Sequence, residues 1–127
     1  MKLRLKGNSL RLRLTQPEVT QMVATGRVEE TVAFGTHALV YALERCDKTS
    51  DVSASFDGHE VTVRVARAVL EAWATTDCVG FERNLEMAGG AFLRLLVEKD
   101  WQCLTARAGE DESSAFPNPN TGCSPTS

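Results

Sequence analysis

Apolar and charged side chains alternate along residues 2–14, on both sides of a Gly7-Asn8 pair. A period of two is typical of a β-strand with one covered face, and glycine at the first turn position favours a type II′ hairpin. One face, which we expect to cover the core, then consists of leucines: Leu3, Leu5, Leu10, Leu12 and Leu14. The other face carries five cations: Lys2, Arg4, Lys6, Arg11 and Arg13.

A helix and two strands are predicted after this hairpin. Thr15 and Glu18 form a capping-box pattern at the start of the helix, and Gly26 stands where its apolar stripe ends. Residues 27–34 and 38–46 follow, with alternating or apolar patterns that predict two strands around a glycine turn.

The same order of elements recurs in the second half of the chain. A hairpin, a short helix and two strands are predicted over residues 51–65, 66–77, 78–87 and 91–100. Individual residues match at spacings of 51 to 53 positions: Gly7 with Gly58, Arg13 with Arg64, Ala38 with Ala91, and Asp47 with Asp100. We therefore predict a duplicated unit, with a first repeat at about residues 1–47 and a second repeat at about 52–100.

These patterns predict an α+β fold, mostly antiparallel β, in which the duplicated ββαββ unit forms an eight-stranded sheet pair or barrel with two short helices. Pairing the two repeats would bury strand edges that each repeat would expose alone. A single globular domain at residues 1–106 accounts for these elements. Over residues 107–127 the periodicity ends, and an acidic sequence rich in Pro, Ser and Asn predicts a tail.

Charge and composition limit the partners of this domain. The net charge of −3 gives no global attraction to nucleic acid or to acidic membranes, and 6% aromatic residues offer little for base stacking. No apolar run resembles a signal peptide or a membrane span. We therefore expect a cytoplasmic protein with reduced cysteines, and neither nucleic acid nor a membrane as its partner.

No pattern in the sequence identifies a catalytic centre. The four cysteines form no Cys-x-x-Cys pair, and with only two histidines the chain has no metal-ligand spacing. Nucleophile-elbow, phosphate-loop and dinucleotide-binding patterns do not occur. We therefore expect no metal and no cofactor, and the catalytic residues of any enzyme activity stay unknown.

The cations of the first hairpin need a partner, because like charges across a hairpin destabilise it. The matching face of the second hairpin is nearly neutral, so the fold does not require these cations. One interpretation is that carboxylates of neighbouring strands neutralise them: Glu44, Asp47, Glu98 and Asp100. A second is an anion-binding site formed by Lys2, Arg4, Arg11 and Arg13, in which the paired arginines bind phosphate or carboxylate in bidentate fashion. The third is that a protein partner, or the acidic residues 110–112 of the same chain, rests on this face.

Three segments resemble a small uncharacterised bacterial family. They are the opening KLRLKGNSLRLRLTQPEV, the segment LLVEKDWQCL and the closing GEDESSAFPNPN. The similarity spans most of residues 1–120, and the opening is its most specific part. Because the family has no assigned activity, the resemblance implies no catalytic residues. It implies that three segments are parts of one family pattern: the hairpin, residues 98–104 and residues 116–119.

Together these observations favour a non-enzymatic binding or interaction module that takes a small anion or an acidic peptide at the first hairpin. One alternative is a small enzyme that acts on a phosphorylated or carboxylate substrate and uses Glu98 and Asp100 beside the arginines. Another alternative is a structural homodimer joined through strand edges.

Overall fold

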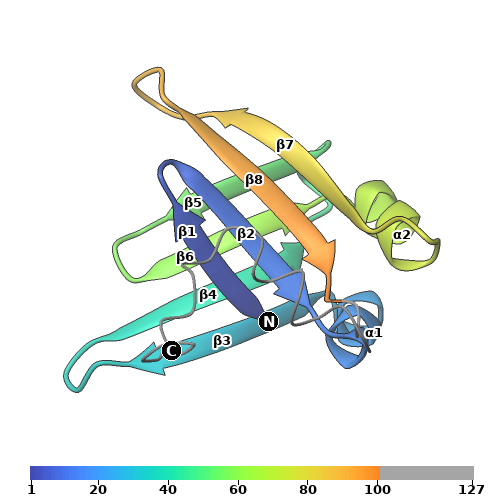
Figure 1. Ribbon diagram of the computed structural model, residues 1–127, viewed down its shortest axis with the longest axis horizontal. Coiled ribbons are helices and arrows are strands. Elements are labelled where there is room, and N and C mark those ends of the chain that lie inside the picture. Colours follow the sequence, from blue (N-terminus) through green and yellow to red (C-terminus); the bar gives the residue numbers. More distant parts are fainter. Residues whose placement is uncertain (101–127) are drawn as a thin grey trace, which may run out of the picture.

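The alternating segments of the sequence form short strands linked by turns and two helices. The computed structural model describes residues 1–100 (Figure 1). In chain order their elements are β1 (Lys2–Lys6), β2 (Ser9–Leu14), α1 (Gln16–Thr25), β3 (Arg27–Ala33), β4 (Ala38–Arg45), β5 (Val52–Phe56), β6 (Glu60–Val65), α2 (Arg67–Ala74), β7 (Gly80–Glu86) and β8 (Phe92–Lys99). The predicted tail at residues 107–127 lies outside the described residues.

The strands form two four-stranded sheets and not a barrel. The first sheet has the order β1-β2-β8-β7, and the second sheet has the order β3-β4-β6-β5 (Figure 1). The predicted α+β fold with a pair of sheets is therefore confirmed. The hairpins are antiparallel, as predicted, whereas the central pairs β2–β8 and β4–β6 are parallel. Alternation within a hairpin specifies which face is covered, and it does not specify which hairpin lies next to it.

Each sheet combines one hairpin from each repeat. α1 carries the chain from the first sheet to the second, and α2 carries it back. The registers of the two sheets agree, because Arg13 of β2 lies opposite Glu98 of β8 just as Arg64 of β6 lies opposite Glu44 of β4. The predicted duplication is thus confirmed by the strand pairing.

Two of the predicted matches between the repeats are wrong by one position. The pairs Ala38–Ala91 and Asp47–Asp100 were aligned as if the last hairpin of each repeat had a turn of equal length. The turn between β7 and β8 is one residue longer than the turn between β3 and β4. Asp100 therefore corresponds to Cys46, and each of them donates its backbone N–H to the last residue of the parallel neighbouring strand.

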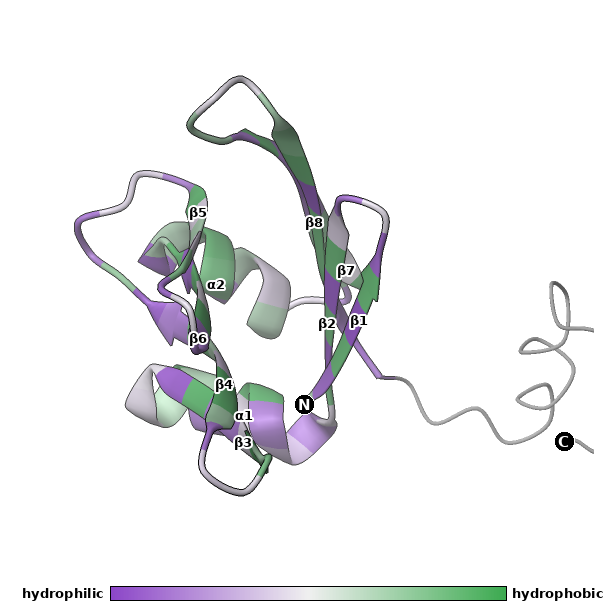
Figure 2. Ribbon diagram, turned by 90° about the vertical axis from the view of Figure 1, so that its left-hand side faces the viewer, coloured by the Kyte–Doolittle hydropathy of each residue, from purple (hydrophilic) through white to green (hydrophobic). Residues whose placement is uncertain are grey.

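The core lies between the two sheets, which face each other in Figure 2. Its fully buried side chains come from both repeats and from both helices: Leu12, Leu14, Met22, Leu43, Val63, Val65, Leu70, Trp73, Leu95 and Val97. The face predicted for the core is the one that is covered in β2. Leu5 shares that face but is 64% exposed, because β1 is an edge strand and Leu5 lies beside its turn.

The predicted ends of α1 are confirmed. The Glu18 carboxylate accepts hydrogen bonds from the backbone N–H and the hydroxyl of Thr15, at 2.8 and 3.1 Å. Gly26 ends the helix in the left-handed conformation with φ 83°, which glycine adopts without steric cost, and its N–H donates to the Met22 carbonyl. This fixed helix start positions the Glu18 carboxylate for a second contact, with the amino group of Met1 directly before β1.

Candidate functional site

The cations of the first hairpin lie on the outer face of the first sheet, away from the core. In the β1–β2 pair, Lys2 lies opposite Arg13 and Arg4 lies opposite Arg11. On the other side of β2, the parallel strand β8 places Glu98 opposite Arg13. Because paired residues share a face of the sheet, these side chains form one continuous charged surface.

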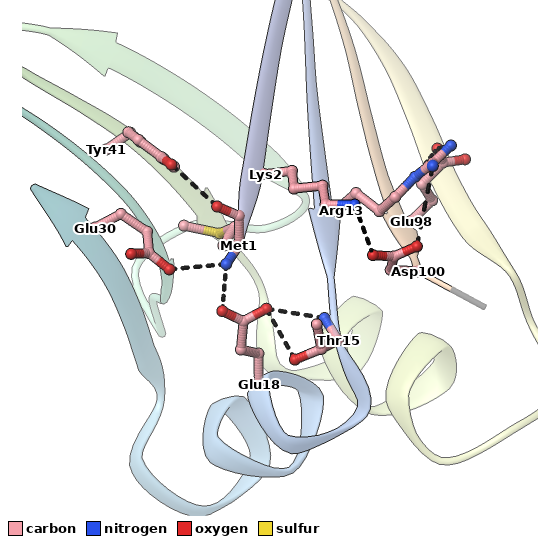
Figure 3. A network of polar contacts seen from close by, with 9 residues as sticks. All are labelled: Met1, Lys2, Arg13, Thr15, Glu18, Glu30, Tyr41, Glu98 and Asp100. Atoms are coloured by element: carbon pink, nitrogen blue, oxygen red, sulfur yellow. Dashed lines mark hydrogen bonds and ion pairs between the residues drawn. The ribbon is translucent and has the colours of Figure 1, made fainter. Parts of the chain in front are cut away.

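One end of this surface is electrically compensated (Figure 3). The Arg13 guanidinium donates to the Glu98 carboxylate, with Nη2 2.9 Å from Oε1. The same carboxylate lies 3.5 Å from Nε of Arg11. Asp100 approaches Lys2 at 3.3 Å and Arg13 at 4.0 Å. Both carboxylates therefore act as counter-ions at the end of the sheet where β1 begins.

The other two carboxylates considered as partners lie elsewhere. Glu44 belongs to β4 in the second sheet and binds the Arg27 guanidinium at 2.6 Å. Asp47 lies 3.7 Å from Arg67 of α2. The interpretation that Glu44 and Asp47 neutralise the first hairpin is wrong, because β8 and not β4 is the strand next to β2.

The hairpin end of the same surface contains two cations, Arg4 and Lys6, that have no acidic neighbour among the described residues. Arg4, Lys6, Ser9 and Arg11 line a hollow of about 230 Å³, which we call the hairpin hollow. Within residues 1–100, no carboxylate lies within ion-pair distance of Arg4 or Lys6, and both side chains are exposed. The hydroxyl of Ser9 donates to the Lys6 carbonyl at 2.6 Å and so ties the two sides of the turn together. The hollow thus presents two guanidinium groups and one ammonium group to solvent.

A second polar cluster anchors the start of β1 (Figure 3). The amino group of Met1 donates to the carboxylates of Glu18 and Glu30, the latter at 2.8 Å, and the Tyr41 hydroxyl donates to the Met1 carbonyl at 3.0 Å. Burial by itself lowers the pKa of this amino group, but the two carboxylates outweigh burial and raise it. The cluster connects β1 to α1, β3 and β4, and so determines where the cation surface begins.

Sequence patterns missed this amino-terminal cluster. Glu18 was explained by the capping box alone, and nothing in that pattern indicates a second partner. Glu30 did give a signal, because it occupies an inward position between Val28 and Val32 in an alternating strand. A carboxylate at such a position needs a charged or hydrogen-bonding partner.

The described residues offer no ready metal centre or membrane helix. Among residues 1–100, no group of three or more His, Cys, Asp or Glu side chains is arranged to hold a metal ion. Neither α1 nor α2 has the length and apolar character required to cross a bilayer. Cys46 and Cys78 are free thiols, and the other two cysteines lie outside the described residues.

Comparison with known proteins identifies the family. The model of a family of unknown function, DUF7009, matches residues 1–120. The chain belongs to DUF7009. No curated protein and no solved structure matches it. The DUF7009 match includes the first hairpin and extends twenty residues beyond Asp100, the last described residue. The resemblance found in the opening, central and closing segments of the sequence is thereby confirmed.

Proposed function

We propose that this DUF7009 protein is a non-enzymatic interaction module that binds an anionic group, a phosphate or a carboxylate, in the hairpin hollow. The observation that carries the proposal is that Arg4, Lys6 and Arg11 line one hollow and that no carboxylate of residues 1–100 lies close to Arg4 or Lys6. Guanidinium groups bind phosphate and carboxylate oxygens through paired N–H donors, and an ammonium group adds a point charge.

The duplication supports a functional origin for these cations. Positions that carry Arg4, Lys6 and Arg11 in the first repeat carry Ser55, Asp57 and Thr62 in the second. The second hairpin forms the same pairs without a cation cluster, so the fold does not need one. A bound anion would offset the repulsion between Arg4 and Arg11, which lie directly opposite each other.

The proposed site contains three cations, whereas the sequence predicted four. It excludes Lys2 and Arg13 and includes Lys6. Lys2 and Arg13 are compensated by Asp100 and Glu98, which leaves the hairpin end as the part of the surface with unmatched positive charge. The same contacts favour binding over catalysis. Glu98, which the enzyme hypothesis would use as an acid or base, is instead held by the two arginines of β2.

Titration with inorganic phosphate tests this proposal. We expect Arg4→Ala to weaken phosphate binding about tenfold, because a charge-assisted hydrogen bond contributes about 1.5 kcal/mol or more. Isothermal titration calorimetry at low salt measures the dissociation constant. Arg67→Ala is the matched control, because it removes an exposed arginine of α2 that lies outside the hollow. Equal affinity in the Arg4→Ala protein and the unmodified protein would contradict the proposal.

The carboxylate of Glu98 competes with phosphate for the Arg11 guanidinium. In contrast to Arg4→Ala, Glu98→Gln is therefore expected to strengthen phosphate binding. Loss of that charge frees the Arg11 guanidinium, and phosphate should bind about twofold to fivefold more tightly, the range expected for one partly exposed ion pair. Glu82→Gln controls for net charge, because Glu82 lies on the same face but binds Arg94. Weaker phosphate binding after Glu98→Gln would place the anion outside the hollow.

A further inference from the structure

We infer that the acidic segment Glu110-Asp111-Glu112 of the same chain occupies the hairpin hollow and competes there with outside anions. This inference rests on the proposed function, because it names an internal ligand for the same cations. Its first support is charge complementarity. Within residues 1–100, Arg4 and Lys6 have no carboxylate partner and Arg11 shares Glu98 with Arg13, so the hollow keeps an excess of positive charge. Residues 110–112 supply three consecutive carboxylates.

The path of the chain supports the same occupant. Asp100 ends the described residues on the outer face of the first sheet, where its backbone N–H donates to the Leu14 carbonyl at 2.7 Å and its carboxylate faces Lys2. From Lys2 the hollow lies along β1, about 13 Å away at the rise of a β-strand. The nine residues between Asp100 and Glu110 can span about 30 Å when extended. The acidic segment can therefore reach the hollow.

The extent of the family match also supports the acidic segment as the occupant of the hollow. The DUF7009 match runs over residues 1–120, so the unit that this family shares includes the cationic hairpin and the acidic segment together. A unit limited to the two sheets would have ended near Asp100.

A tethered acidic segment is suited to regulate access to the hollow. A short linker gives the segment an effective concentration of the order of millimolar, so it outcompetes a weak free anion. Its contacts are exposed ion pairs, which are individually weak and sensitive to salt. A ligand with higher charge density, or with contacts outside the hollow, would therefore displace the segment. The hollow would respond to such ligands and ignore ordinary carboxylates.

The experiment compares the full chain with the variant Glu110→Gln/Asp111→Asn/Glu112→Gln. Two quantities are measured: the phosphate dissociation constant, and the NMR resonances of the Arg4 and Arg11 guanidinium N–H groups without phosphate. We expect the variant to bind phosphate about threefold more tightly or better, and both arginine resonances to move. The matched control is Glu71→Gln/Asp77→Asn/Glu86→Gln, which removes the same charge from exposed positions outside the hollow.

The two measurements separate this inference from the proposed function. Unmoved arginine resonances together with equal phosphate affinity would overturn the acidic occupant and leave the anion site standing. Shifted resonances without any phosphate binding would support the occupant and overturn the site for outside phosphate. Equal shifts in the control variant would show a general charge effect and would also overturn the inference.

Discussion

Replacement of Trp73 by alanine is expected to lower the free energy of unfolding by about 3–5 kcal/mol, the range for removal of a buried aromatic side chain. Trp73 is 1% exposed, and its ring packs edge-on against Phe81 with the ring centroids 5.6 Å apart. The indole N–H donates to the Val79 carbonyl at 3.1 Å. Alanine would leave a cavity where α2 meets β7, and the Val79 carbonyl would keep only its hydrogen bond from the backbone N–H of Lys99. Urea unfolding followed by circular dichroism measures the loss.

Two controls make this prediction specific. Trp73→Phe keeps most of the apolar volume but lacks the N–H group, so it should cost clearly less than Trp73→Ala. The folded fraction of either variant should bind phosphate with unchanged affinity, because Trp73 belongs to the core and not to the hairpin hollow. A loss below about 1 kcal/mol for Trp73→Ala would contradict the packing described for this side chain.

The local parts of the fold could be predicted from the sequence because they depend on neighbouring residues. Alternation identified the hairpins and their covered faces, and the Thr15–Glu18 pattern with Gly26 identified both ends of α1. The helical stripes were also correct in outline, since Met22 and Trp73 are both fully buried. These two residues occupy matching places in α1 and α2, at the spacing of 51 that also relates Gly7 to Gly58.

The contacts between hairpins could not be predicted in the same way. A strand with one covered face is compatible with several neighbours, and the choice depends on packing of the whole domain. Glu44 lies in β4, a strand of the first repeat, and Asp47 follows that strand, yet β4 belongs to the second sheet and not to the sheet of the first hairpin. The ion pairs of the charged surface on the first hairpin could not be predicted for the same reason. Period two showed that Arg4 and Arg11 share a face, but only the position of β8 shows which cations Glu98 compensates.

Replacement of Glu18 by alanine is expected to lower the free energy of unfolding by about 2–4 kcal/mol near neutral pH. The change removes the hydrogen bonds at the start of α1, which contribute about 1 kcal/mol, and takes one of two carboxylates from the buried amino group of Met1. Glu18→Gln keeps an acceptor for the Thr15 N–H but no charge for Met1, so it should cost less. Glu82→Ala, which removes an exposed partner of Arg94, should cost little.

The stabilising effect of this cluster should depend on pH in a defined direction. Burial alone would raise the pKa of Glu18, but hydrogen bonds from the Met1 amino group and Thr15 lower it below its ordinary value. Its contribution is therefore complete above the unfolded pKa and is lost as the pH falls through the folded pKa. The raised pKa of the Met1 amino group has the opposite sign, so that contribution is complete below the unfolded pKa and is lost as the pH rises through the folded one.

The difference in unfolding free energy between the unmodified protein and Glu18→Ala should therefore be largest between about pH 5 and pH 8 and should shrink at both extremes. Urea midpoints measured from pH 3 to pH 10 give this profile. A difference that stays constant across the range would mean that the carboxylate acts only as a helix cap.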